Sequence, residues 1–136
     1  MQPIFDKVIA PLLDALPDAI VLVDEAGGII FANQAVKPLL GYEPPELVGQ
    51  PLSTLVPSRF RELHQRLVAS FWQDPKPRSM TSRPLLYALS KAGEEVPVTI
   101  SLAPVALRGE RCCVASLRDA SAIQSQITTI LGGILV

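Results

Sequence analysis

The sequence predicts an α+β domain, because its strand patterns and helix patterns occur in separate runs rather than in alternation. Two short apolar segments joined by a glycine turn indicate a β-hairpin in the first quarter of the chain. One long amphipathic helix pattern occupies the middle, and three strand patterns joined by short turns follow it. The 136 residues suit a single domain with one hydrophobic core.

Residues 3–16 predict an N-terminal helix, since apolar side chains recur there at every fourth position. The stripe consists of Ile4, Val8, Leu12 and Leu16. Pro11 lacks a backbone donor, so we expect it to kink or divide this helix, and Pro17 ends it.

The hairpin is predicted from two β-branched segments, Ala19–Asp24 and Gly28–Ala32, which flank a turn. Asn33 follows directly, at the position where a helix N-cap belongs. We therefore expect a short helix from residue 34 to 40, ended by Gly41.

Residues 58–72 give the clearest helix pattern, after a segment rich in proline. Its apolar face consists of Phe60, Leu63, His64, Leu67, Val68 and Phe71. Proline or aspartate breaks lie on both sides, so we expect this helix to be able to shift as a unit.

Three strands joined by short turns are predicted next, and such strands form an antiparallel meander. They cover residues 85–90, 96–105 and 111–118. The tail from Ala120 to Leu131 is a predicted helix. Its isoleucines at 123, 127, 130 and 134 have coiled-coil spacing.

The composition indicates a cytoplasmic protein without a membrane span. The net charge is −1 with both signs interspersed, which excludes the basic surface typical of nucleic-acid binding. No apolar run has the length of a membrane span, and no secretory signal is present at the N-terminus. Cys112 and Cys113 are strand neighbours that rarely pair, so a reducing compartment suits them.

The residue combinations that catalysis requires are missing. His64 is the only histidine, and no serine lies in a nucleophile motif. The glycine pair in the hairpin turn has no phosphate-loop lysine, and a second cysteine pair for a metal site is lacking. We expect this domain to have no enzymatic activity and no metal site.

Several motifs, taken in order and with their spacing, resemble the PAS family of sensory domains over roughly residues 12–121. They are Leu16–Asp24, Gly28–Ala35, Leu40–Tyr42, Glu46–Pro51, Lys91–Val98 and Leu117–Ser121. The resemblance implies a five-stranded antiparallel sheet with helices packed over one face. It places the sensory domain at residues 18–119, an N-terminal flanking helix at 1–17 and a C-terminal signal-relay helix at 120–136.

The resemblance also implies a ligand cleft between sheet and helices. Candidate cleft residues are Phe31, Asn33, Phe60, His64, Leu67, Phe71, Tyr87, Ser101 and Ser116. His64 is chemically able to ligate haem iron. However, oxygen-sensing haem members carry the ligand histidine after the Asp-Pro break, where this chain has Arg78. The Asn-Cys-Arg motif of flavin-binding relatives is also missing, so we expect no cofactor.

Two functions remain open at this stage. In the first, the domain binds an unknown small molecule in the cleft and relays occupancy through Arg118, Asp119 and Ser121 to a kinase or DNA-binding effector, as in two-component systems and transcription regulation. In the second, the cleft is filled by side chains and the domain only dimerises or binds another protein. In both we expect a homodimer through the flanking helices, at Ile4, Val8, Leu12, Ile123, Ile127 and Ile130.

Overall fold

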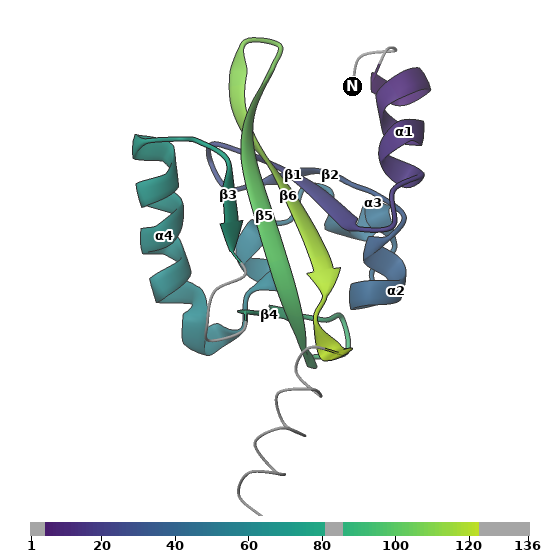
Figure 1. Cartoon of the computed structure of the whole chain (residues 1–136), viewed down its shortest axis with the longest axis vertical. Coiled ribbons are helices and arrows are strands. Elements are labelled where there is room, and N and C mark those ends of the chain that lie inside the picture. The colour runs from purple at the N-terminus through teal and green to yellow at the C-terminus, as the bar shows by residue number, and fades with distance from the viewer. Residues whose placement is uncertain (1–4, 81–85, 123–136) are drawn as a thin grey trace, which may run out of the picture.

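The computed structural model describes residues 5–80 and 86–122, and it confirms the predicted α+β fold. One antiparallel sheet has the strand order β2-β1-β6-β5-β3, and β4 pairs with β5 beside β3 (Figure 1). The strands are β1 (Ala19–Asp24), β2 (Ile29–Ala32), β3 (Arg78–Met80), β4 (Leu86–Leu89), β5 (Glu95–Leu107) and β6 (Glu110–Asp119).

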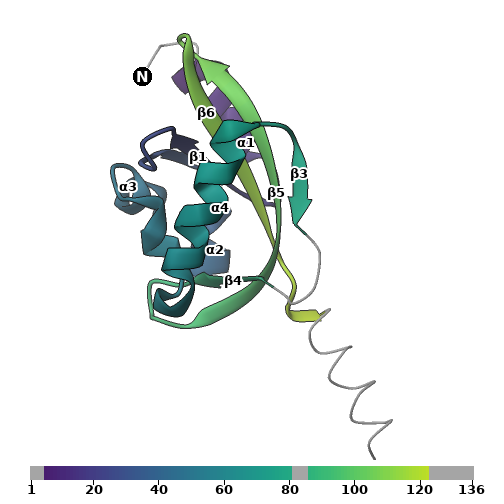
Figure 2. The same cartoon turned by 90° about the vertical axis from the view of Figure 1, so that its left-hand side faces the viewer.

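The helices are short except for one. They are α1 (Ala10–Asp14), α2 (Val36–Leu40), α3 (Pro44–Leu47) and α4 (Arg61–Gln73). A π-helical turn at Phe5–Ile9 precedes α1, and 3-10 turns lie at Leu52–Leu55 and Ser58–Phe60. Figure 2 shows α2, α3 and α4 on the same side of the sheet, as the family resemblance implies. None of the helices in the described part of the chain is long and apolar enough to cross a membrane.

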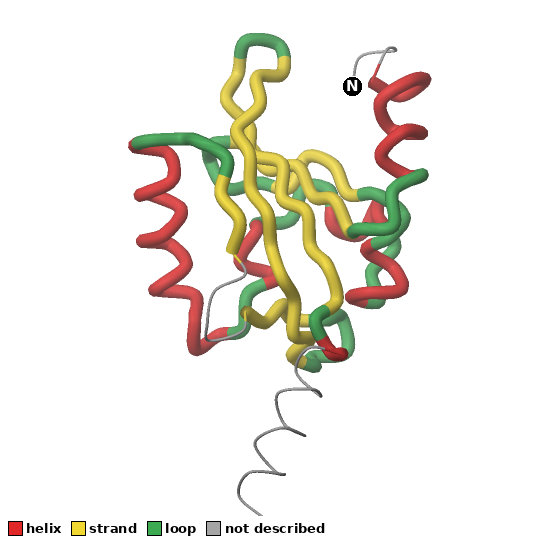
Figure 3. The backbone as a smooth tube through the Cα atoms, viewed as in Figure 1, coloured by secondary structure: helices red, strands yellow, loops and turns green. Residues whose placement is uncertain are grey.

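The β5–β6 hairpin contains the two longest strands of the sheet. Its ladder runs from Val98 opposite Asp119 to Leu107 opposite Glu110, and its tip extends beyond the other strands (Figure 3). Arg108 and Gly109 both have positive φ angles at that tip, which a tight turn between twisted strands requires. Because β6 also pairs with β1, it occupies the centre of the sheet and ends at Asp119.

Alternation along the strands divides the sheet into a helix-covered inner face and an outer face. Val21, Val98 and Ala115 belong to the buried inner core, together with Val36, Leu40 and Leu47 from α2 and α3. The side chains next to them in sequence point to the outer face. The core therefore fills the space between the sheet and the two short helices.

Two local predictions differ from the structure. Arg78–Met80 forms a strand that the sequence did not reveal, because three residues after a proline-rich break are too few to show alternation. Asn33 was expected to cap α2, but Ala35 holds the N-cap position and no side chain bonds there. Gly41 ends α2 as predicted, with a φ of 81°.

The N-terminal segment is divided near Pro11, as predicted, into the π-helical turn and α1. Val8, Leu12 and Leu16 of the predicted stripe are exposed by 52%, 63% and 45%, but α1 ends at Asp14, so Leu16 lies just beyond the helix that was predicted to include it. The remaining predicted dimer residues, Ile4, Ile123, Ile127 and Ile130, lie outside the described residues.

Candidate functional site

The last strand ends in a segment in which each residue has a defined contact. We call Arg118–Ser121 the exit segment. Asp119 Oδ1 accepts a hydrogen bond from the Ser121 N–H at 2.8 Å, and a helical turn starts at Ser121. The fully buried Ala120 donates its N–H to the Pro97 carbonyl at 2.8 Å. The bonds from Ser121 lower the pKa of Asp119, so its carboxylate stays charged and can cap the helix.

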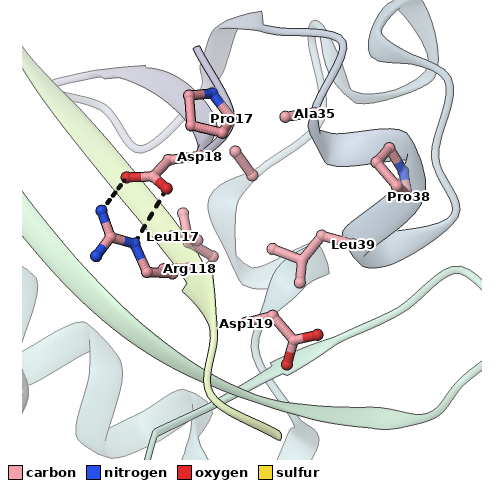
Figure 4. A pocket seen from close by; sticks show the side chains of 9 residues that line it. Pro17, Asp18, Ala35, Pro38, Leu39, Leu117, Arg118 and Asp119 are labelled. Atoms are coloured by element: carbon pink, nitrogen blue, oxygen red, sulfur yellow. Dashed lines mark hydrogen bonds and ion pairs between the residues drawn. The ribbon is translucent and has the colours of Figure 1, made fainter. Parts of the chain in front are cut away.

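Arg118 connects the exit segment to the start of the sheet. Its Nε and Nη2 donate to the two carboxylate oxygens of Asp18 at 3.1 Å each (Figure 4). Ser116 Oγ donates to Asp18 Oδ2 at 3.2 Å. The Arg118 guanidinium holds the pKa of Asp18 below its ordinary value, and the bond from Ser116 adds to this effect.

Asn33 bonds the N-terminal segment to the start of β1. Its side chain is completely buried. Its Oδ1 accepts the Ile20 N–H at 2.8 Å, while its Nδ2 donates to the carbonyls of Leu13 at 2.7 Å and Asp18 at 3.0 Å. Nearby, Asp14 Oδ1 accepts the Gln34 N–H at 2.9 Å. We call these contacts the N-terminal clamp, because they fasten the end of α1 to the sheet.

A surface groove of about 460 Å³ lies where the N-terminal segment, α2 and the exit segment meet. Leu39, Pro38 and Ala35 from α2 and its approach form one wall in Figure 4, and Leu117, Arg118 and Asp119 form the facing wall. The N-terminal segment closes one end of the groove with Pro17 and Asp18.

Only part of the predicted cleft set comes together on α4. Phe60, just before the helix, and His64 are half-buried, and Phe71 is buried. Burial lowers the pKa of His64, so its imidazole is neutral at physiological pH. Leu67 is 44% exposed and lies at the outer edge of this face, whereas the half-buried Val68 continues it.

The other predicted cleft residues lie elsewhere. Asn33 belongs to the N-terminal clamp, and Ser101 is exposed. Phe31, Tyr87 and Ser116 each flank inward-pointing core residues in their strands and therefore point to the outer face. Sequence reasoning left the strand register open, and the register decides this distribution.

Both ends of α4 are fastened to the sheet. Before the helix, the Arg59 guanidinium pairs with the Glu95 carboxylate of β5. At the other end, Arg111 of β6 donates to the Trp72 carbonyl at 3.1 Å and lies 5.1 Å from the centre of the Trp72 ring. Arg111 also makes a two-point ion pair with Glu25.

The site residue that sequence reasoning missed is Asp18. It was part of the family motif, but its partner Arg118 is 100 positions away. Local spacing does not show such a pair, and only the antiparallel pairing of Ala19 with Leu117 brings the two side chains together.

Comparison with known proteins identifies the fold. The family model described as "PAS fold" matches residues 10–120. The PAS domain of a Colwellia psychrerythraea protein superposes with a TM-score of 0.70, at 24% identity over 85% of this chain and 96% of that one. A PAS domain from Desulfitobacterium hafniense gives a TM-score of 0.68, at 22% identity over 80% of this chain and 98% of that one.

Curated relatives are much longer proteins. The chain is 26% identical over 121 residues to the oxygen sensor protein DosP of Escherichia coli, which corresponds to 89% of this chain and 15% of that protein. It is also 26% identical over 105 residues to a probable serine/threonine-protein kinase of Dictyostelium discoideum, of which it spans 7%. The family match covers most of the chain and agrees with the sheet order and helix placement, and the chain belongs to the PAS family.

Proposed function

We propose that this PAS domain is a sensory relay module of a longer signalling protein, and that its output leaves through the exit segment. The observation that carries the proposal is the capped helix start at Ser121, which follows directly on the central strand. A change of twist in β6 reaches the helix within two residues, so no long pathway is needed. The effector is proposed to be a kinase or a DNA-binding domain, and the similarity to a probable serine/threonine-protein kinase supports the first of these.

The test is Asp119→Ala in a full-length protein that carries this domain. Loss of the cap removes about 0.5–2 kcal/mol of helix-start stability. We expect regulated effector output to be lost while the PAS fold, followed by circular dichroism, is retained. Glu110→Ala, an exposed carboxylate at the far end of the same strand, is the matched control. Normal regulation in Asp119→Ala would remove the exit segment from the relay.

A ligand site is the second part of the proposal, and its place is the inner face of α4. The core fills the space over α2 and α3, so the remaining candidate is the face with Phe60, His64 and Phe71. His64 supplies a polar group among apolar ones, as small-molecule sites commonly require. Its neutral imidazole can donate one hydrogen bond and accept another.

Two tryptophan substitutions in one helix test this site. Val68→Trp inserts a large side chain at a half-buried position, whereas Leu67→Trp adds it at the exposed edge. Native mass spectrometry of protein purified from cells reports a co-purifying small molecule. We expect the wild type and Leu67→Trp to retain it and Val68→Trp to lose it. Equal retention by both variants contradicts a ligand at α4 and means that the ligand binds elsewhere, whereas no co-purifying molecule in the wild type favours the dimerisation module.

A further inference from the structure

We propose that the Asp18–Arg118 ion pair is a latch that couples the N-terminal clamp to the exit segment, so that displacing either one loosens the other. The domain then transmits a signal from its N-terminal helix to the helical turn that starts at Ser121, in addition to any ligand signal. This inference rests on the proposed function only in using the same exit segment.

Asp18 belongs to both structures at once. Its backbone carbonyl accepts a hydrogen bond from Asn33 Nδ2, which also holds the last turn of α1 through the Leu13 carbonyl. Its carboxylate accepts two bonds from Arg118. Moving the end of α1 therefore moves the acceptor to which Arg118 is bound.

Arg118 is the neighbour of the helix cap. Asp119 follows it directly and bonds the Ser121 N–H. A two-point contact fixes the direction of the guanidinium plane as well as its distance, so a rotation of Asp18 is passed to this strand end. Ser116 adds a third bond from the same strand.

The ion pair extends the connection between the two segments beyond the end of the strand ladder, which pairs Ala19 with Leu117. The groove of about 460 Å³ lies beside the ion pair, lined by Pro17 and Asp18 at one end and by Arg118 and Asp119 along a wall (Figure 4). A coupling of this kind is reciprocal, since each end must change the other by the same factor.

Amide hydrogen exchange of the 136-residue chain, followed by NMR, tests both directions. Asp14→Ala removes the acceptor of the Gln34 N–H and loosens the clamp. We expect exchange of the Ala120 amide at the other end to accelerate about twofold to fivefold, the range that an exposed ion pair transmits. Asp119→Ala loosens the exit, and the Gln34 amide should accelerate by the same factor.

The same two measurements in an Arg118→Gln background decide whether the latch carries the effect. We expect both long-range effects to disappear there and to persist in Arg66→Gln, which removes an exposed ion pair off the route. The Val21 amide in the core serves as the reference for global unfolding.

The latch is wrong if Asp14→Ala and Asp119→Ala do not accelerate amide exchange at the distant end in an otherwise wild-type chain. It is also wrong if the acceleration persists in the Arg118→Gln background. If Asp119→Ala still abolishes effector output in that case, the latch is wrong and the proposed relay stands. If the long-range exchange effects are present but Asp119→Ala leaves effector output normal, the latch stands and the proposed relay is wrong.

Discussion

At the scale of single residues, Asn33 has the largest effect on stability that the structure predicts. Asn33→Ala leaves the buried Ile20 N–H and two carbonyls without their partner. The buried Ile20 N–H left unpaired costs about 1–3 kcal/mol, and the two carbonyls are only partly buried and add less, so we expect the free energy of unfolding to fall by about 2–4 kcal/mol. Chemical denaturation measures it. The exposed neighbour variant Gln34→Ala should change it by less than about 0.5 kcal/mol, and similar losses in both would show that the clamp contributes little.

Asp18 gives the protein a specific pH dependence. Its pKa is lower in the folded state than its unfolded value of about 3.9, so its stabilising contribution is fully present above that value. It is lost as the pH falls below about 4 and the carboxylate is protonated. We expect the wild type to lose more stability than Asp18→Asn between about pH 5 and pH 2. If the free energy of unfolding changed with pH in the same way in the two proteins, the assigned ion pair would be contradicted.

His64 and Arg78 together predict whether the purified protein contains haem. The family resemblance leads us to expect a haem-ligand histidine after the Asp-Pro break, where this chain has Arg78, and the Arg78 guanidinium lies 5.5 Å from the centre of the Phe71 ring. We therefore expect protein purified from cells to show no Soret band. A band that disappears in His64→Ala would restore the haem interpretation.

At the scale of elements, α4 is less free than its flanking prolines and aspartate suggest. Its ends are tied by Arg59 to Glu95 and by Arg111 to Trp72 and Glu25. These ion pairs are exposed and screened by salt, so they set the resting position of the helix without preventing its movement. We expect Arg111→Gln to speed amide exchange in the last turn of α4, and Arg66→Gln on the outer surface to leave it unchanged. Equal exchange in both variants would show that Arg111 does not hold the helix.

The elements also show what sequence can and cannot predict. The hairpin, the long helix and the β5–β6 pair were predictable because their patterns are local and each spans enough residues. Asn33 was placed at a cap because the residue type and position fit, but its side chain makes three bonds to distant backbone groups instead. The cleft set depended on strand register, which local pattern does not determine, so Ser101 and Ser116 were included although both point to the outer face.

At the scale of the whole molecule, the exposed stripe on the N-terminal segment predicts self-association. Val8, Leu12 and, just after α1, Leu16 expose apolar surface, and a second copy can cover it. We expect the wild type to sediment as a dimer and Leu12→Glu to shift toward monomer. Leu63→Glu on α4 makes the same change at a leucine that is 50% exposed and lies off the stripe, and should remain dimeric. A monomeric wild type would contradict the dimer proposal.

The central claim is that Asp119 sets the direction in which the chain leaves the sheet. Electron paramagnetic resonance tests it directly, with spin labels at the exposed positions Gln34 and Ala122. Burial raises the pKa of the Cys112 and Cys113 thiols, which keeps them slow to react with the label. With the labelled chain diluted into unlabelled protein, so that distances between the two copies of a dimer do not contribute, we predict one narrow distance distribution in the wild type and a broadened one in Asp119→Ala. The same narrow distribution in both proteins would contradict the claim.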